Sequence, residues 1–301
     1  MTSERAWEVP EPASVLEVRL DADTCTVLRR HGNPEGPRLV LSHGNGLAID
    51  LYYPFWSLLA ADFDLFLYDL RNHGWNSVGP QASHTLPTLI RDHDLILEAI
   101  ERDCGSKPIV GIFHSFSALT SLMSSDGSHS YAGRVLFDPP VCKPGRSQLQ
   151  FDAAAEMTAA MTRRRTDRFR SEADYVDALR LTPAFTRVVP GVHELMARTT
   201  LRKTTGGEDF ELRCPKAYEA QIVDYVRAFA ALVDFDALAC PTKVVGADPT
   251  LPYSYLPTFD MTHVLTVDYD FIPEATHFLP LENPAACAAA TRDFVRLQCL
   301  Y

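Results

Sequence analysis

Short apolar runs alternate along the chain with longer stretches in which apolar residues recur every three or four positions. The short runs fit buried strands, while the longer pattern, as in Leu89, Ile96 and Ile100 of residues 89–101, fits one face of a helix. Strands that alternate with helices are typical of a parallel sheet flanked by helices, so we expect an α/β fold. The predicted strands cover residues 15–20, 24–29, 39–42, 65–68, 108–113, 134–137, 241–248 and 263–267, and a helix is predicted near residues 53–61.

The segment from residue 141 to 238 follows a different pattern. Strand patterns vanish there, and helical stretches rich in arginine and alanine are broken by prolines such as Pro183 and Pro190. We therefore predict an α/β core in two parts, residues 1–140 and 239–301, with a helical lid at 141–238 inserted after the sixth core strand. The predicted lid helices cover residues 151–170, 172–181, 192–201 and 217–231.

Length and charge narrow the class of protein. The 301 residues suffice for one large α/β domain with an inserted segment. A net charge of −11 disfavours nucleic acid and anionic membrane surfaces as partners, and no apolar run approaches the length of a membrane span. The first residues lack the basic start and apolar stretch of a signal peptide, so we expect a cytoplasmic location. The sequence does not set the oligomeric state, and a homodimer is compatible with it.

The cysteines and histidines give no indication of a metal or cofactor. Seven cysteines are scattered without a Cys-x-x-Cys pair, and ten histidines show none of the spacings typical of zinc sites. An odd number of scattered cysteines is typical of reduced thiols, so we expect no disulfide framework, no metal and no cofactor.

A candidate nucleophile lies where the apolar run 108–113 meets a helical pattern. The junction reads His114-Ser115-Phe116-Ser117. A serine on a sharp strand-to-helix turn presents its hydroxyl at the end of the sheet, where a base can reach it. The residues two before and two after such a serine are usually glycine; Ser117 is small enough, whereas Phe113 departs from the pattern.

Three further motifs complete a recognisable set. His43-Gly44-Asn45-Gly46 follows the strand 39–42, a turn at 69–74 follows the strand 65–68, and His277 lies in a loop just before the closing helix. Together they resemble the α/β-hydrolase superfamily over roughly residues 36–298. The resemblance implies a mostly parallel sheet flanked by helices, Ser115 as nucleophile and His277 as its base.

The resemblance also implies the groups that would hold the substrate. The backbone N–H groups of Asn45 and Phe116 would stabilise the negative charge that develops on the substrate oxygen. Gly44 and Gly46 would let the backbone turn tightly and approach the substrate, and His114 is a further candidate for substrate contact.

Two aspartates compete for the role of the acid that orients His277. Asp138 ends the strand after the nucleophile strand, and Asp248 ends the next one. Both strand ends lie at the same edge of a parallel sheet, and the superfamily uses either position. Asp248 matches the commoner arrangement, whereas Asp138 matches the acyl-CoA and polyketide-pathway thioesterase branch. Asp138 is our first choice and Asp248 the alternative; the other acid would cap a helix or brace a loop.

The predicted function is that of a serine hydrolase that cleaves a small-molecule ester or thioester through an acyl-enzyme on Ser115. One alternative is a carbon–carbon bond hydrolase or lyase with the same Ser115 and His277, and another is a binding module without catalysis. Whether the arginines of the run 163–170 bind coenzyme A phosphates stays open, and a solvated helix face is the favoured explanation.

Overall fold

The computed structural model describes residues 7–124, 131–251 and 267–298. Its centre is a sheet whose eight described strands run in the order β1-β2-β4-β3-β5-β6-β10-β11. The first two strands form an antiparallel hairpin, β2 pairs antiparallel with β4, and the other neighbours are parallel. The strands are β1 (Ser14–Arg19), β2 (Cys25–Gly32), β3 (Arg38–Ser42), β4 (Asp64–Tyr68), β5 (Ile109–His114), β6 (Tyr131–Phe137), β10 (Thr242–Gly246) and β11 (Asp268–Phe271).

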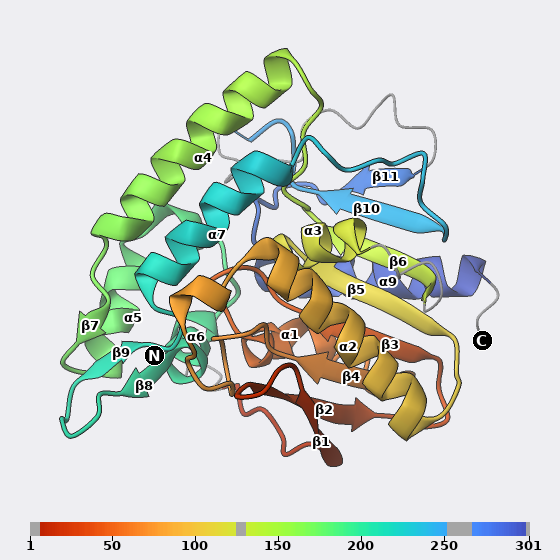
Figure 1. The fold of residues 1–301 in the computed structure, drawn as a ribbon, viewed down its shortest axis with the longest axis horizontal. Coiled ribbons are helices and arrows are strands. Elements are labelled where there is room, and N and C mark those ends of the chain that lie inside the picture. Colours follow the sequence, from red (N-terminus) through yellow and green to blue (C-terminus); the bar gives the residue numbers. More distant parts are fainter. Residues whose placement is uncertain (1–6, 125–130, 252–266, 299–301) are drawn as a thin grey trace.

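Helices cover both faces of this sheet (Figure 1). Helices α2 (Leu86–Cys104) and α3 (Phe116–Met123) pack on one face with Val40 and Phe66, while α1 (Tyr53–Trp56), α8 (Leu279–Glu282) and α9 (Pro284–Leu297) pack on the other with Leu39 and Leu67. Alternate residues of one strand thus reach opposite cores, which is why the strands read as continuous apolar runs. The mostly parallel α/β sheet predicted from the sequence is confirmed.

The boundaries differ from the predictions in two places of this core. The strand predicted over 263–267 lies, apart from Val267, outside the described residues, and β11 begins at Asp268. Helix α1 ends at Trp56, although a helix was predicted as far as residue 61. Short 3-10 turns occur at η1 (Ile49–Tyr52), η2 (Gln81–Ser83) and η3 (Pro183–Phe185).

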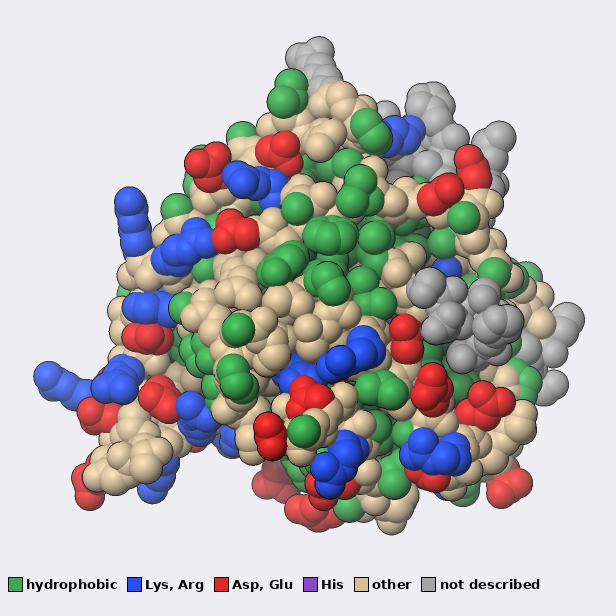
Figure 2. Space-filling view, viewed as in Figure 1, with side chains coloured by type: hydrophobic (Ala, Val, Ile, Leu, Met, Phe, Trp, Pro, Cys, Tyr) green, Lys and Arg blue, Asp and Glu red, His purple; other side chains and the backbone are tan. Residues whose placement is uncertain are grey.

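The chain between β6 and β10, where the sequence predicted a lid at 141–238, is mostly helical, and we call residues 146–229 the lid segment. Helices α4 and α7 lie side by side along one edge of the molecule (Figure 1), and apolar side chains gather in the middle of the same view (Figure 2). The lid helices are α4 (Arg146–Arg164), α5 (Glu172–Arg180), α6 (Val192–Thr200) and α7 (Lys216–Phe229).

The lid segment also contains a small antiparallel sheet that the sequence did not reveal. Its strands are β7 (Arg168–Phe169), β9 (Phe210–Leu212) and β8 (Leu201–Lys203). The helix predicted over 151–170 is therefore wrong at its end, because the chain leaves α4 after Arg164 and enters this sheet. Strands of two or three residues are too short for a period of two to stand out.

A buried ionic network fixes the loop that follows β4. Arg29 donates to Asp69 over 2.7 Å and to Asp50 over 3.0 Å. Asp69 also accepts the backbone N–H groups of Ile49 and Trp75, at 2.8 and 3.1 Å. These hydrogen bonds connect the loop after β4 to the start of η1.

Among the described residues, none of the helices has the length and apolar character that a membrane span requires.

Histidines are unusually numerous in the core. His93, for example, bridges the hydroxyls of Tyr68 and Tyr131 with 2.7 Å hydrogen bonds at both ring nitrogens. Burial lowers the pKa of six buried histidines and keeps them neutral: His31, His43, His73, His84, His93 and His114.

These histidines predict a steep loss of stability in mild acid. The unfolded chain takes up protons at histidine near pH 6.5, whereas the folded pKa of His31 and of His84 is about 4. Stability is therefore complete above about pH 6.5 and falls as the pH drops, by about 1.4 kcal/mol per pH unit for each histidine held neutral. We expect urea unfolding to show a loss of several kcal/mol between pH 7 and 5.5. His31→Gln should reduce this slope, and constant stability over the interval would contradict the argument.

Candidate active site

Ser115 occupies the sharp turn between β5 and α3. Its backbone has φ 53° and ψ −118°, a conformation that is strained for any residue except glycine. The Ser115 N–H donates to the carbonyl of Phe137 over 2.9 Å, and the Ser117 hydroxyl bonds back to the His114 carbonyl over 3.0 Å. Phe113, which departs from the usual pattern, packs edge-on against Tyr131 in the core.

His277 contacts Ser115 and Asp138 at the same time. Its Nε2 lies 3.0 Å from Ser115 Oγ, and its Nδ1 lies 2.6 Å from Asp138 Oδ2. All three side chains are buried. A carboxylate only accepts, so we assign the imidazole proton to Nδ1, which leaves the lone pair of Nε2 facing the serine hydroxyl. The geometry is that of a nucleophile, a base and an orienting acid.

Asp248, the alternative acid, makes a different set of hydrogen bonds. Its carboxylate accepts the N–H and hydroxyl of Thr250, at 2.8 and 2.7 Å, and the N–H of Glu274 at 2.8 Å. The bond from Glu274 is the main reason that the pKa of Asp248 is lowered. Its backbone N–H donates to Ala275, so Asp248 braces the loop that carries His277. The structure thus brings Asp138, and not Asp248, to the imidazole.

The turn after β3 leaves one backbone N–H without a partner. Gly44 N–H donates to the hydroxyl of Tyr52 over 3.2 Å, and Gly46 N–H donates to His73 Nε2 over 3.0 Å. Among the described residues no acceptor is found for the N–H of Asn45 between them, nor for the N–H of Phe116. These are the two N–H groups that, by the resemblance, would stabilise the negative charge on the substrate oxygen.

Gly44 and Gly46 are required for steric reasons. A Cβ on Gly44 would lie 2.9 Å from His114 Nδ1 and 3.2 Å from Ser115 Cβ. Gly46 has φ +76°, and a Cβ there would collide with the carboxylate of Glu219. Both glycines therefore allow close approach, in one case to the serine and in the other to the lid segment.

Glu219, on α7, is the residue of this region that sequence reasoning missed. Its backbone carbonyl accepts a hydrogen bond of 2.9 Å from Asn45 Nδ2, and its buried side chain is paired with Arg165. Burial raises the pKa of Glu219. Asn45 Oδ1 is buried and has no partner among the described residues. Glu219 and Asn45 are 174 positions apart in the chain, so no local pattern could have joined them.

Both ring nitrogens of His114, the further candidate for substrate contact, are hydrogen-bonded within the protein. Its Nε2 lies 2.8 Å from the His277 carbonyl, and its Nδ1 lies 2.6 Å from the Tyr52 hydroxyl. A carbonyl only accepts, so Nε2 carries the proton and Nδ1 accepts from Tyr52, whose oxygen accepts from Gly44. The hydrogen bonds therefore run from Gly44 through Tyr52 and His114 to the carbonyl of His277, and they use both ring nitrogens of His114. Burial keeps the pKa of His114 well below its usual value.

The arginine run of the lid pairs largely with acids of the same segment. Arg163 pairs with Asp224, Arg165 with Glu219, and Arg168 lies 3.7 Å from Glu211. These pairs fit a charged helix face and add no support for a phosphate clamp.

Comparison with known proteins identifies the family of the chain. The model of the alpha/beta hydrolase family matches residues 39–290. The chain belongs to this family. Comparison with curated protein sequences gives no match. This alpha/beta hydrolase is also similar to several solved structures.

The solved structures show the same fold at low sequence identity. The E-2-(acetamidomethylene)succinate hydrolase is 16% identical, with a TM-score of 0.76, over 94% of this chain and 99% of the other. The thioesterase domain from the curacin biosynthetic pathway is 17% identical, with a TM-score of 0.70, over 92% and 99%. An esterase from Thermogutta terrifontis is 19% identical, with a TM-score of 0.64, over 95% and 99%.

Removal of the Tyr52 hydroxyl tests the bonds behind the site. Tyr52→Phe leaves both Gly44 N–H and His114 Nδ1 without a buried partner, and each such loss typically costs about 1–3 kcal/mol. We expect the free energy of unfolding to fall by about 2 kcal/mol or more, and Ser115 to react more slowly with a fluorophosphonate probe. Tyr53→Phe, at the neighbouring position, is the matched control. Equal stability and reactivity of the two variants would contradict the assigned chain of bonds.

Proposed function

We propose that this alpha/beta hydrolase cleaves a carboxylic ester or thioester through an acyl-enzyme on Ser115. The observation that carries the proposal is the pair of hydrogen bonds made by His277, at 3.0 Å to the Ser115 hydroxyl and 2.6 Å to Asp138. A serine hydroxyl is a poor nucleophile at neutral pH, and an oriented imidazole is what activates it.

The proposed reaction has two halves that use the same groups. Ser115 Oγ attacks the carbonyl carbon while its proton passes to His277 Nε2, and Asp138 stabilises the resulting imidazolium. The tetrahedral intermediate collapses, and the leaving alkoxide or thiolate takes the proton from His277. A water molecule then gives a proton to His277 and attacks the acyl carbon. The second tetrahedral intermediate collapses as the bond from the acyl carbon to Ser115 Oγ breaks, and His277 returns its proton to Oγ, which releases the acid and the free serine.

The charge on the tetrahedral oxygen would be held by the N–H groups of Asn45 and Phe116. Both groups are without an acceptor among the described residues, so they need not break a bond in order to bind. Donors fixed in this way lower the barrier most, and the loss of one typically costs about 3 kcal/mol.

The ester or thioester class rests on two lines of support. Asp138 at the end of β6 is the acid position by which the chain resembles the thioesterase branch. The solved structures of similar fold include a thioesterase domain and an esterase by name. The activity test is turnover of p-nitrophenyl acyl esters and of acyl-CoA thioesters by the wild type and by Ser115→Ala, together with fluorophosphonate labelling of Ser115.

Each result of this test has a defined meaning. Turnover that Ser115→Ala abolishes supports the proposal. Labelling without turnover of either class points instead to the carbon–carbon bond hydrolase or lyase alternative, and no labelling points to a binding module.

The two aspartates provide a matched pair of variants. Asp138→Asn removes the acceptor that fixes the proton on His277 Nδ1, so we expect kcat to fall by about 10³–10⁴-fold. Asp248→Asn changes an acid that only braces the loop, and we expect less than about a tenfold loss. Steady-state kinetics at pH 7.5, with circular dichroism to verify folding, measures both. A larger loss in Asp248→Asn would refute the assignment of the acid.

A further inference from the structure

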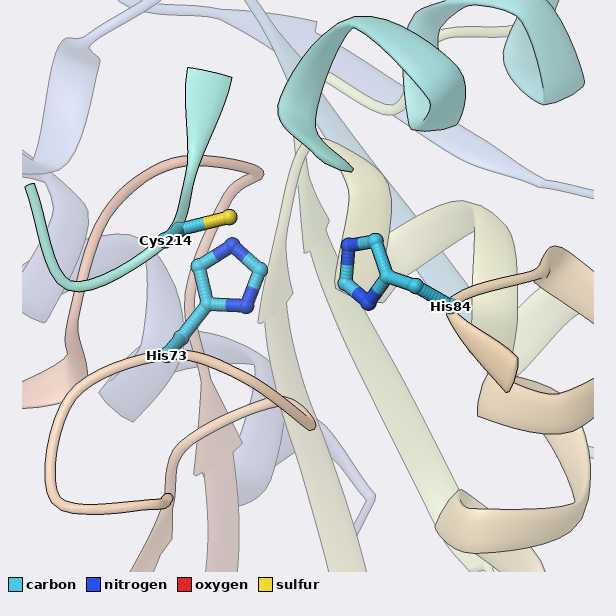
Figure 3. A group of neighbouring side chains, drawn as sticks. All are labelled: His73, His84 and Cys214. Carbon is cyan, nitrogen blue, oxygen red and sulfur yellow. The ribbon is translucent and has the colours of Figure 1, made fainter. Parts of the chain in front are cut away.

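Three potential metal ligands converge at the junction of the lid segment and the core. Figure 3 shows the imidazoles of His73 and His84 facing one another, with the Cys214 sulfur beside the His73 ring. All three residues are buried, and one ligand atom from each lies within 4.8 Å of the others. In the part of the chain that the structure describes, no other histidine, cysteine or acid group meets this criterion. His73 comes from the loop after β4, His84 follows η2, and Cys214 precedes α7.

The protonation of His73 suits a cation, whereas burial raises the pKa of Cys214, whose thiol must lose its proton to bind one. His73 Nδ1 lies 2.9 Å from the carbonyl of Arg71, so it carries the proton and the lone pair is on Nε2. A histidine held in this way by a backbone carbonyl is a common arrangement in metal sites. Burial lowers the pKa of both histidines, to about 4 for His84, so both are neutral at pH 7. Neutral imidazole is the form that binds metals.

His84 and Cys214 add groups with unused bonding capacity. His84 Nε2 is buried and has no hydrogen-bond partner among the described residues. The Cys214 thiol has only a weak contact of 3.9 Å with the carbonyl of Pro215. A buried, unpaired ring nitrogen beside a thiol and a second imidazole is costly for a core that serves packing alone.

Two existing bonds oppose metal binding and determine its consequence. His73 Nε2 accepts the N–H of Gly46 over 3.0 Å, and His84 Nδ1 faces the side-chain amide of Asn72 over 2.9 Å. An ion would take the His73 lone pair from Gly46. It would also require the His84 proton to move to Nδ1 and the Asn72 amide to turn. A metal–thiolate bond can offset both losses, and the ligand atoms, which lie within 4.8 Å of one another, must move closer together to share an ion at bonding distances of about 2.0–2.3 Å.

We propose that His73, His84 and Cys214 bind one thiophilic divalent cation, such as Zn²⁺ or Cd²⁺, and that the bound ion inhibits the enzyme. The Cys214 thiol loses its proton to solvent as the sulfur–metal bond forms, and water completes a tetrahedral shell. Gly46 loses its acceptor, so the turn that presents Asn45 N–H loses one of the bonds that hold it. The inhibition rests on the proposed function, whereas the binding does not.

Co²⁺ is the probe for binding, because thiolate ligation gives it a charge-transfer absorption in the near ultraviolet. We expect a band that saturates at one Co²⁺ per chain and is displaced by Zn²⁺. Cys214→Ser should abolish the band, and His84→Gln should weaken binding at least about a hundredfold. Cys142→Ser, which changes another buried cysteine, is the matched control and should keep the band. Because the ligands are buried, spectra are read after the signal becomes constant.

Inhibition is measured separately from binding. Zn²⁺ should slow fluorophosphonate labelling of Ser115 in the wild type and in Cys142→Ser, but not in Cys214→Ser. Absence of a saturable band in the wild type, or an unchanged band in Cys214→Ser, overturns the site. If Cys214→Ser fails to fold, His84→Gln decides on the same criterion. A band in a protein that neither labels nor turns over ester would leave the metal site standing and refute the proposed function instead.

Discussion

The hydrogen bond between His277 Nδ1 and Asp138 is the interaction on which the rest of the site depends. At 2.6 Å, and buried on both sides, it fixes the ring orientation and the proton that together aim Nε2 at Ser115. Asp138 is itself held by the sheet, since its N–H donates to Val245 over 2.9 Å and its other oxygen accepts the N–H of Ala247 at 3.3 Å. The acid is therefore as rigid as the strands β6 and β10, which suits a group whose task is orientation.

A second layer of bonds arranges the site from behind. The chain through Tyr52 and His114 links the turn after β3 to the backbone of His277, while His73 holds Gly46. These bonds occupy the N–H groups on either side of Asn45 and leave its own N–H unpaired. Neutral histidine serves here as a combined donor and acceptor, which ties the organisation of the site to conditions that keep these rings unprotonated.

The sequence predicted those features that depend on local pattern. The strand, turn and helix around Ser115 are contiguous, so apolar runs and a small residue at 117 were sufficient. The choice between Asp138 and Asp248 was not decidable in this way, because both end parallel strands and only the course of the loop before His277 separates them. Glu219 shows the same limit, since its contact with the turn after β3 arises from the packing of the lid segment.

The position of Glu219 couples the lid segment to the turn after β3. Its side chain fills the space that a Cβ on Gly46 would need, and its carbonyl holds the side chain of Asn45. Helix α7 and the turn after β3 therefore cannot shift independently. Under the proposed function, a substrate that displaces α7 would also disturb the N–H of Asn45, so a misfitting acyl group would lose transition-state stabilisation as well as binding. The lid segment would then influence kcat as well as substrate affinity.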